Sequence, residues 1–181
     1  ELDSALVHSK QMIEGMQLDG TFGRLATEDA GLLLKKEEFK LDSLLLADAE
    51  VTLVIDSIIP SDTTDTTVNR WRITAERLDL RRVGFTLRMP QDTLSVTSYL
   101  GAARLIRGYA DLGAQRYGAA QLDIRGAYAA YDATDRPRTI GLDPQHISAS
   151  NIRLLADSVR YHNGDLRVAI REGELDERSG L

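Results

Sequence analysis

The stretch WRITAERLDLRRVGFTLRM, residues 71–89, carries the clearest structural signal in this chain. Apolar and polar residues alternate along it in three short runs, whose apolar members are Trp71, Ile73 and Ala75, then Leu78 and Leu80, then Val83, Phe85, Leu87 and Met89. Alternate side chains of an extended strand point to opposite faces, so the pattern predicts a β-strand with one apolar face. The alternation changes phase at Glu76–Arg77 and at Arg81–Arg82, which predicts a bulge or sharp corner at each pair.

The same spacing of apolar residues recurs twice more, without a fixed period. The matched sets are Leu78, Leu80, Phe85 and Leu87; Leu122, Ile124, Ala129 and Tyr131; and Ile152, Leu154, Val159 and Tyr161. Because loops of different length would separate such units, we interpret the chain as stacked quasi-repeats. They lie around residues 41–56, 71–89, 122–131 and 147–170, within a single fragment (1–181) of a longer β-repeat region.

The predicted fold is mostly β, an elongated, curled sheet or groove of antiparallel strands with little helix. Asn163–Gly164 predicts a tight hairpin, because both residues tolerate positive φ. The polar segment PSDTTDTTVN, residues 60–69, predicts an exposed loop or hairpin connection. The segment 26–40 leaves two alternatives, a short helix beginning near Thr27 or two strands that meet at a turn over Lys35–Glu38. We favour the strands.

Composition excludes several classes of protein. The net charge is −6 and no basic stripe with interleaved aromatic residues is present, which argues against a nucleic-acid ligand. The chain has no cysteine, so disulfides and thiolate sites are excluded. No stretch is long and apolar enough to span a bilayer as a helix. The scattered arginines are expected on a solvated strand face: Arg77, Arg81, Arg82, Arg125, Arg153, Arg160, Arg167 and Arg171.

The sequence offers no convergent set of catalytic or metal-binding groups. The histidines His8, His146 and His162 are isolated, with no second histidine or carboxylate at helical or hairpin ligand spacing around them, and we expect surface or turn positions for them. Asp62 and Asp65 lie in a threonine-rich segment that lacks the glycine and terminal glutamate of a calcium loop. There is no phosphate-binding glycine loop and no nucleophile elbow. We therefore expect a protein that is not an enzyme and that has no metal site and no cofactor.

The alternating apolar face has two interpretations. Such a face most often packs as the core of a β-sandwich or barrel. The variable repeat spacing, the low aromatic content of 6% and the lack of a cap at either end instead favour an open-ended stacked sheet.

Three segments resemble a known family: LDSLLLADAEVTLVIDS (41–57), WRITAERLDLRRVGFTLRMP (71–90) and the final stretch from GLDPQHISASNIRLL onward (141–181). They are similar to the periplasmic repeats of AsmA-like proteins, in particular the TamB-type translocation and assembly proteins of the Bacteroidetes group. The resemblance implies a β-taco or β-solenoid-like groove in a periplasmic protein that is anchored to the inner membrane. It implies lipid acyl chains, chiefly of phospholipid, and outer-membrane assembly proteins as partners. The anchor and the family's carboxy-terminal domain, which would make the membrane contacts, are not in this sequence.

The expected function is thus a lipid conduit or an aid to protein assembly in the outer membrane. The predicted groove-lining residues are Val51, Leu53, Ile55, Trp71, Ile73, Val83, Phe85, Leu87, Leu122, Ile124, Ile152, Leu154, Val159, Leu166, Val168 and Ile170. Two alternatives stay open: a structural or adhesive β-solenoid that binds protein or glycan, and a glycan-acting enzyme on a β-helix.

Overall fold

The computed structural model describes residues 1–8, 16–55, 70–141 and 143–177. These residues form one nine-stranded sheet, in which the helical turns are two short 3₁₀ segments, η1 (Leu34–Lys36) and η2 (Pro90–Asp92). The strands are β1 (Leu2–His8), β2 (Met16–Leu33), β3 (Glu38–Ile55), β4 (Arg72–Met89), β5 (Leu94–Asp111), β6 (Arg116–Ala119), β7 (Gln121–Asp132), β8 (His146–His162) and β9 (Asp165–Glu177). The prediction of an elongated, curled, mostly β fold with little helix is confirmed.

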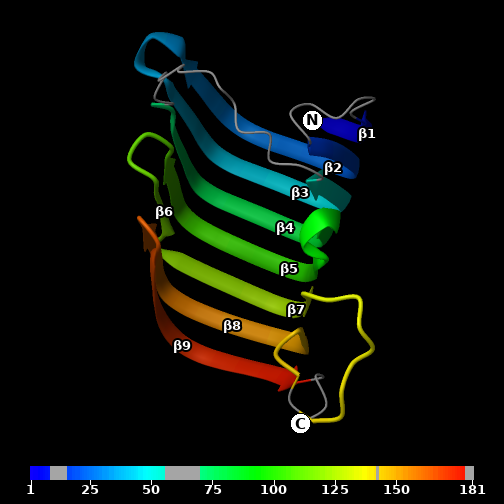
Figure 1. The fold of residues 1–181 in the computed structure, drawn as a ribbon. Helices are drawn as coiled ribbons and strands as arrows, with labels where there is room; N and C mark the ends of the chain where they lie inside the picture. The colour runs from blue at the N-terminus through cyan, green and yellow to red at the C-terminus, as the bar shows by residue number, and fades with distance from the viewer. Residues whose placement is uncertain (9–15, 56–69, 142, 178–181) are drawn as a thin grey trace.

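The strands follow one another across the sheet nearly in chain order, from β1 at one edge to β9 at the other (Figure 1). Strands β6 and β7 together occupy one position, because both pair with β5 on one side and with β8 on the other. All pairs are antiparallel except β3 and β4, which run parallel. A tight hairpin would have made this pair antiparallel. Residues 56–69, which include the predicted loop or hairpin connection, lie outside the described residues.

The ambiguous segment 26–40 forms strands. It continues β2 to Leu33, turns at η1 and enters β3 at Glu38, with Glu37 in the left-handed conformation at φ 54°. The favoured strand interpretation is confirmed and the helix alternative is wrong. The predicted hairpin at Asn163–Gly164 is also confirmed, because both residues have positive φ (49° and 89°) and join β8 to β9.

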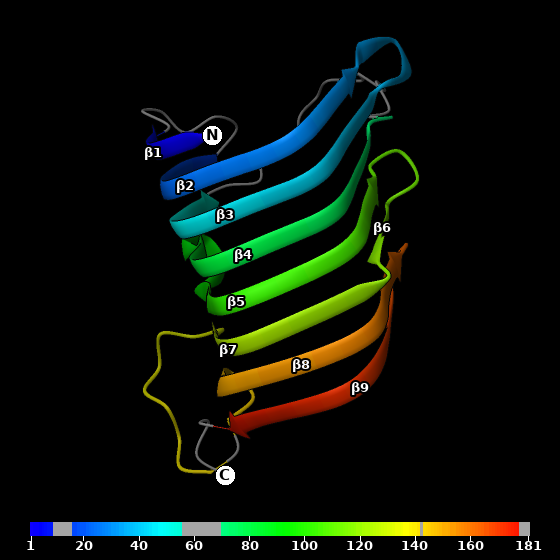
Figure 2. The same cartoon turned by 180° about the vertical axis from the view of Figure 1, so that it is seen from behind.

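The long strands bend together, as Figure 2 shows. Along the paired strands, the one-to-one pairing of residues is interrupted at two places, and at each place one residue per strand is left unpaired. We call these places the first bend and the second bend. The first bend contains Asp29, Asp42, Glu76, Arg107, Ala120 and Asp157. The second contains Ser4, Gly23, Asp48, Arg82, Gly101, Gly126 and Asn151. Arg82 has positive φ (52°), so the predicted corner at Arg81–Arg82 is confirmed. At Glu76–Arg77 the pairing of β4 with both neighbours leaves out Glu76, which lies beside the left-handed Arg107 of β5 (φ 49°).

Glycine is required at two positions of the second bend by close backbone approach. A Cβ on Gly101 would lie 2.9 Å from the carbonyl oxygen of Gly126 on β7, and a Cβ on Gly23 would lie 2.6 Å from the Cβ of Asp48 on β3. Both contacts are shorter than atoms tolerate. The second bend therefore depends on the absence of a side chain at these sites.

The sheet is a single layer in the part of the chain that the structure describes. It exposes 12534 Å² of surface, whereas a compact protein of 20.0 kDa exposes about 8,700 Å². The buried apolar residues are small apart from Leu41; the others are Ala47, Ala49, Ala103, Ala119, Ala127 and Ala156. A sandwich or barrel core is thus not present among the described residues.

The third quasi-repeat runs in the opposite direction to the first two. Strand β8 is antiparallel to β7, and Ile152 lies beside Ala127 rather than beside Leu122. Ile152 is therefore the neighbour, across the sheet, of the Val83 position and not of Leu78. The spacing still matches because the apolar residues are placed almost symmetrically about Asp79, with one bend on each side. The pattern is therefore nearly the same in either chain direction.

We expect Gly101→Ala to lower the free energy of unfolding by about 1–3 kcal/mol, because the new methyl group would push against a backbone carbonyl that cannot move away. Gly31→Ala is the matched control, since a Cβ there meets nothing within 4 Å. The control should be neutral or slightly stabilising. Urea denaturation measures both variants, and equal effects would show that the close approach does not constrain the bend.

Candidate functional site

One face of the sheet carries apolar residues in rows that cross the strands. A row is a set of residues paired from strand to strand; the row of Leu78, for example, contains Leu44, Leu105 and Leu122. We call apolar face the seven rows that pass through Ile73, Ala75, Leu78, Leu80, Val83, Phe85 and Leu87 on β4. The opposite side of the sheet is the polar face.

The rows on the two sides of each bend lie on the same side of the sheet. Ala75 and Leu78, which flank the first bend, line one shared hollow. On β5, a Cβ built on Gly108 would collide with the side chain of Leu105, although a left-handed residue, Arg107, lies between them. The second bend repeats this local geometry on β4, where the left-handed Arg82 lies between Leu80 and Val83. The phase change in the sequence therefore keeps the apolar face continuous.

The apolar face contains a hollow of about 340 Å³ at the first bend. Its lining contains no charged residue: Ile73, Ala75, Leu78, Leu105, Gly108, Tyr109, Ala110, Tyr117, Gly118, Ala119, Leu122, Val159 and Tyr161. The rings of Tyr117 and Tyr161 lie 5.7 Å apart at its side, which is a favourable aromatic spacing. This hollow can hold an apolar group without a specific polar contact.

The structure brings the predicted groove-lining residues together on the apolar face. Phe85 and Leu87 share rows with Val51 and Leu53 of β3, and Val83 shares its row with Ala49. The rows continue on β7 and β8 through Leu122, Ile124, Ile152, Leu154 and Val159. Leu166, Val168 and Ile170 extend them onto β9. Ile55 ends β3, and Trp71 precedes β4 with its carbonyl oxygen accepting a hydrogen bond from the Leu112 N–H at 2.9 Å. A role of these residues in lipid binding stays a prediction.

Sequence reasoning missed the share of the apolar face that β2 and β5 contribute. Phe22 and Leu25 on β2, and Leu100 and Leu105 on β5, belong to its rows. On β5 the alternation is diluted by Gly101, Ala102 and Ala103, so no clear period was visible. These residues are identified by their strand pairing, directly or through β3, with the strongly alternating strand β4. Strand pairing cannot be inferred from a single sequence.

The polar face is held by arginine–carboxylate pairs. Asp79 is nearly buried (9% exposed) and accepts hydrogen bonds from Arg77 at 2.5 Å and from Arg104 of β5 at 2.8 Å. Burial alone would raise the pKa of Asp79, but the hydrogen bonds from Arg104 and Arg77 outweigh it and lower the pKa below its ordinary value. All eight arginines predicted on a solvated strand face are exposed.

A larger hollow of about 960 Å³ lies against β7, β8 and β9, and its lining is charged. Within it Arg125 donates to Asp123 at 2.6 Å, and Arg153 lies 3.9 Å from Glu174. Two further carboxylates, Glu172 and Asp176, lie in the lining, but the described residues contain no histidine–carboxylate cluster that could hold a metal ion. We therefore place the candidate site on the apolar face.

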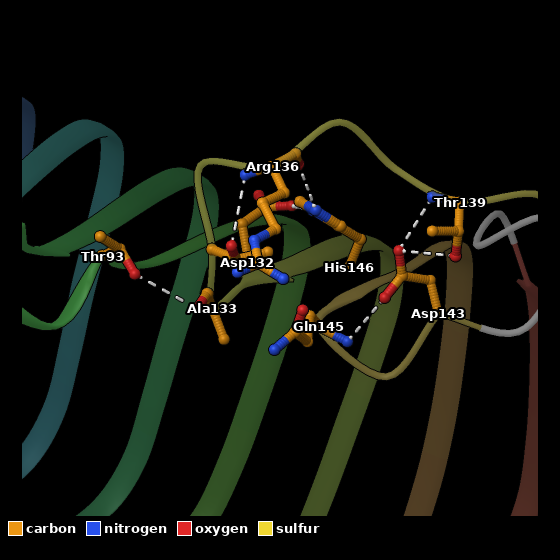
Figure 3. A network of polar contacts seen from close by, with 9 residues as sticks. Thr93, Asp132, Ala133, Arg136, Thr139, Asp143, Gln145 and His146 are labelled. Atoms are coloured by element: carbon orange, nitrogen blue, oxygen red, sulfur yellow. Dashed lines mark hydrogen bonds and ion pairs between the residues drawn. The ribbon is translucent and has the colours of Figure 1, made fainter.

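The loop between β7 and β8 contains a network of polar contacts (Figure 3). The Asp143 carboxylate, 6% exposed, accepts hydrogen bonds from the Thr139 N–H and hydroxyl and from the Gln145 N–H. His146 bonds through Nδ1 to Asp132 at 2.8 Å and through Nε2 to the carbonyl oxygen of Arg136 at 2.9 Å. His8 pairs likewise with Asp19. The carboxylate partners of His8 and His146 lie on neighbouring strands, so spacing along the sequence did not reveal them.

The described residues contain no cluster of histidine and carboxylate side chains able to hold a metal ion, and no helix among them is long and apolar enough to cross a membrane. Comparison of the sequence with known protein families and with curated proteins finds no match.

Asp79→Asn should lower the free energy of unfolding by about 1–2 kcal/mol at neutral pH, because it leaves two arginines beside a partly buried site without a counter-charge. Asp48→Asn is the matched control: its pair with Arg82 is half-exposed and should matter clearly less. Since the pKa of Asp79 is lowered, its contribution is present above an ordinary carboxyl pKa and is lost as the pH falls through the lowered value. Urea denaturation at neutral and acid pH tests both points; equal losses in the two variants would contradict them.

The hydrogen bond to Asp132 raises the pKa of His146, burial opposes it, and the bond to the Arg136 carbonyl adds to it. Both ring nitrogens face acceptors, which only the protonated ring satisfies. The loop contacts should therefore be complete below the ordinary histidine pKa of about 6.5 and weaken as the pH rises through the raised value. Hydrogen exchange at Arg136 and His146, corrected for intrinsic rates, should accelerate over this interval in the native chain and not in His146→Gln. An unchanged profile would contradict the assignment.

Proposed function

We propose that this chain is a non-enzymatic segment of a periplasmic envelope-biogenesis protein, whose apolar face holds phospholipid acyl chains on their way to the outer membrane or supports protein assembly there. The observation that carries the proposal is a continuous apolar face with no second layer over it among the described residues. Soluble monomers rarely leave such a surface uncovered unless it binds something apolar. The resemblance to AsmA-like and TamB-type repeats agrees with this, and it supplies the proposed anchoring of the full-length protein to the inner membrane.

The dimensions suit acyl chains. Strands β2 to β9 occupy seven positions, so the apolar rows extend for roughly 29 Å across the sheet. A single leaflet's acyl chains span about half of the ~30 Å bilayer core, so one chain fits along a row with room to move. Each buried CH₂ group contributes about 0.8 kcal/mol, which is enough to hold a lipid without polar recognition. Because no polar recognition is needed, we expect the apolar face to have low selectivity among acyl chains.

The adhesive β-solenoid is the weaker candidate. A solenoid interior is filled by its own side chains, whereas on this apolar face Phe85 is 36% exposed and Tyr117 and Tyr161 are each 37% exposed. Side chains that remain this accessible have room for an external ligand. The carboxylates of the charged hollow, such as Glu172 and Asp176, lie on β9 along an exposed edge strand, so no specific observation favours the glycan enzyme.

We expect Phe85→Asp to abolish lipid binding while shifting the melting temperature by less than about 4 °C, because the new carboxylate can reach water from an open face. Tyr128→Asp, equally exposed at 38% but in the Tyr99 row of the polar face, is the matched control and should keep lipid binding. Lipid extraction with mass spectrometry measures occupancy, and quenching of Trp71 fluorescence by a brominated fatty acid locates it. Failure of Phe85→Asp to fold would favour a closed, packed interior, and absence of lipid and quenching in the native chain would refute the proposal.

A further inference from the structure

Strand β9 forms a long edge of the sheet (Figure 1). Among the described residues it pairs with β8 alone, and all 13 of its residues are exposed, whereas the other edge strand, β1, has 7 residues. Proteins usually protect such an edge with proline, with lysine or by keeping the strand short, and residues 165–177 contain neither proline nor lysine. The backbone N–H and C=O groups along this edge can therefore pair with another strand.

The apolar face continues to this edge. Gly173 pairs with Leu154 of the apolar face, and Leu175, two residues further along the strand, lies on the same side. Leu166, Ile170 and Leu175 are each more than half exposed. A strand added beside β9, with its own apolar side chains on this side of the sheet, would cover all three.

Two charged side chains of β9 have no partner of opposite charge among the described residues. Arg167 lies directly opposite Arg160 of β8, where like charges repel, and Glu172 lies opposite Leu155. Charge is also divided along the strand. Residues 165–171 contain two arginines and one aspartate, and residues 172–177 contain four carboxylates and no basic residue. The strand is therefore complementary in charge to a second copy of itself that runs in the opposite direction.

We propose that β9 pairs with β9 of a second copy of this chain, antiparallel to it and about a two-fold axis perpendicular to the sheet. In the register that we assign, Arg167 lies opposite Asp176 of the second copy, and Arg171 lies opposite Glu172 of the second copy. Both side chains that lack an opposite charge within the chain then gain one. Backbone hydrogen bonds along the edge provide the affinity, and the charges select the register.

The same register matches the two faces. A Cβ built on Gly173 would lie 3.7 Å from the side chain of Ile170, so these residues lie on the same side of the sheet although two residues separate them. The register opposes Ile170 to Gly173 of the second copy and Val168 to Leu175 of the second copy, so apolar residues meet apolar residues. Because the two-fold axis keeps both apolar faces on one side, the dimer has one apolar face twice as wide. The pairing does not depend on acyl-chain binding.

Analytical ultracentrifugation over a range of protein concentrations tests the proposal. The native chain should form a dimer and no larger species, because a two-fold contact closes on itself. Arg167→Glu should weaken dimerisation about ten-fold or more, since it opposes two carboxylates at two symmetry-related places, and Asp176→Arg should do the same by opposing two arginines. A mixture of the two variants should dimerise as the native chain does, because opposite charges then meet at both places.

Arg81→Glu is the matched control, because Arg81 is an exposed arginine of the central strand β4 without an ion pair among the described residues. It should dimerise as the native chain does. Arg167→Glu should keep the native melting temperature, since the new carboxylate lies opposite Arg160 within the chain. Equal weakening in Arg81→Glu and Arg167→Glu would overturn the proposal.

Cysteine substitutions test the register, because the chain has no cysteine of its own. A mixture of Val168→Cys and Leu175→Cys should give a disulfide-linked dimer, whereas Val168→Cys alone should not, because its two copies would lie about 23 Å apart along the strands. A monomer at every concentration, a mixture of Arg167→Glu and Asp176→Arg that stays monomeric, or a disulfide in Val168→Cys alone would overturn the proposal.

Phe85→Asp separates edge pairing from contact between apolar faces, and it should still dimerise. Loss of the dimer in this variant would overturn the proposal, because it would show that the apolar faces make the contact. Arg167→Glu should retain lipid binding and Trp71 quenching by brominated fatty acid, so failure of edge pairing is distinguishable from failure of acyl-chain binding.

Discussion

The backbone hydrogen-bond ladder is the interaction on which the rest of this structure depends. A single layer has no opposing sheet or helix to bury side chains against, so neighbouring strands are held by their ladders and by cross-strand contacts on the two faces. Long strands compensate: β2, β3, β4 and β5 each run for 18 residues. The ladder leaves one apolar face free, which is why a binding function for that face is physically reasonable.

The two faces of the sheet differ in how their side chains interact. On the polar face, Asp79 joins Arg77 of its own strand to Arg104 of the next, and Asp48 joins Arg82 across the parallel pair of strands. On the apolar face, small residues such as Ala49 and Ala156 are fully buried beneath larger neighbours. Larger side chains in the same face, such as Phe85, stay partly exposed. Because the ion pairs of the polar face help to hold the strands together, the side chains of the apolar face can remain exposed.

The edges and the loops extend this division. Strand β9 is exposed along its whole length, and the apolar rows reach it at Leu166, Val168 and Ile170, so the apolar face is open at that edge among the described residues. The loop between β7 and β8 stands at the strand ends with its own polar scaffold.

The sequence by itself determined which segments form strands, which of their side chains share a face and where the strands bend. These features follow from period-two alternation and from its phase changes at Glu76–Arg77 and Arg81–Arg82, which are local properties of the chain. It did not determine strand direction: the pattern around Asp79 is nearly palindromic, so the reversed β8 looked like a repeat of β4. Nor did it reveal the parallel pairing of β3 with β4, the rows supplied by β2 and β5, or the bond between His146 and Asp132. Only the tertiary structure decided these, because they depend on which strands pair and in what register.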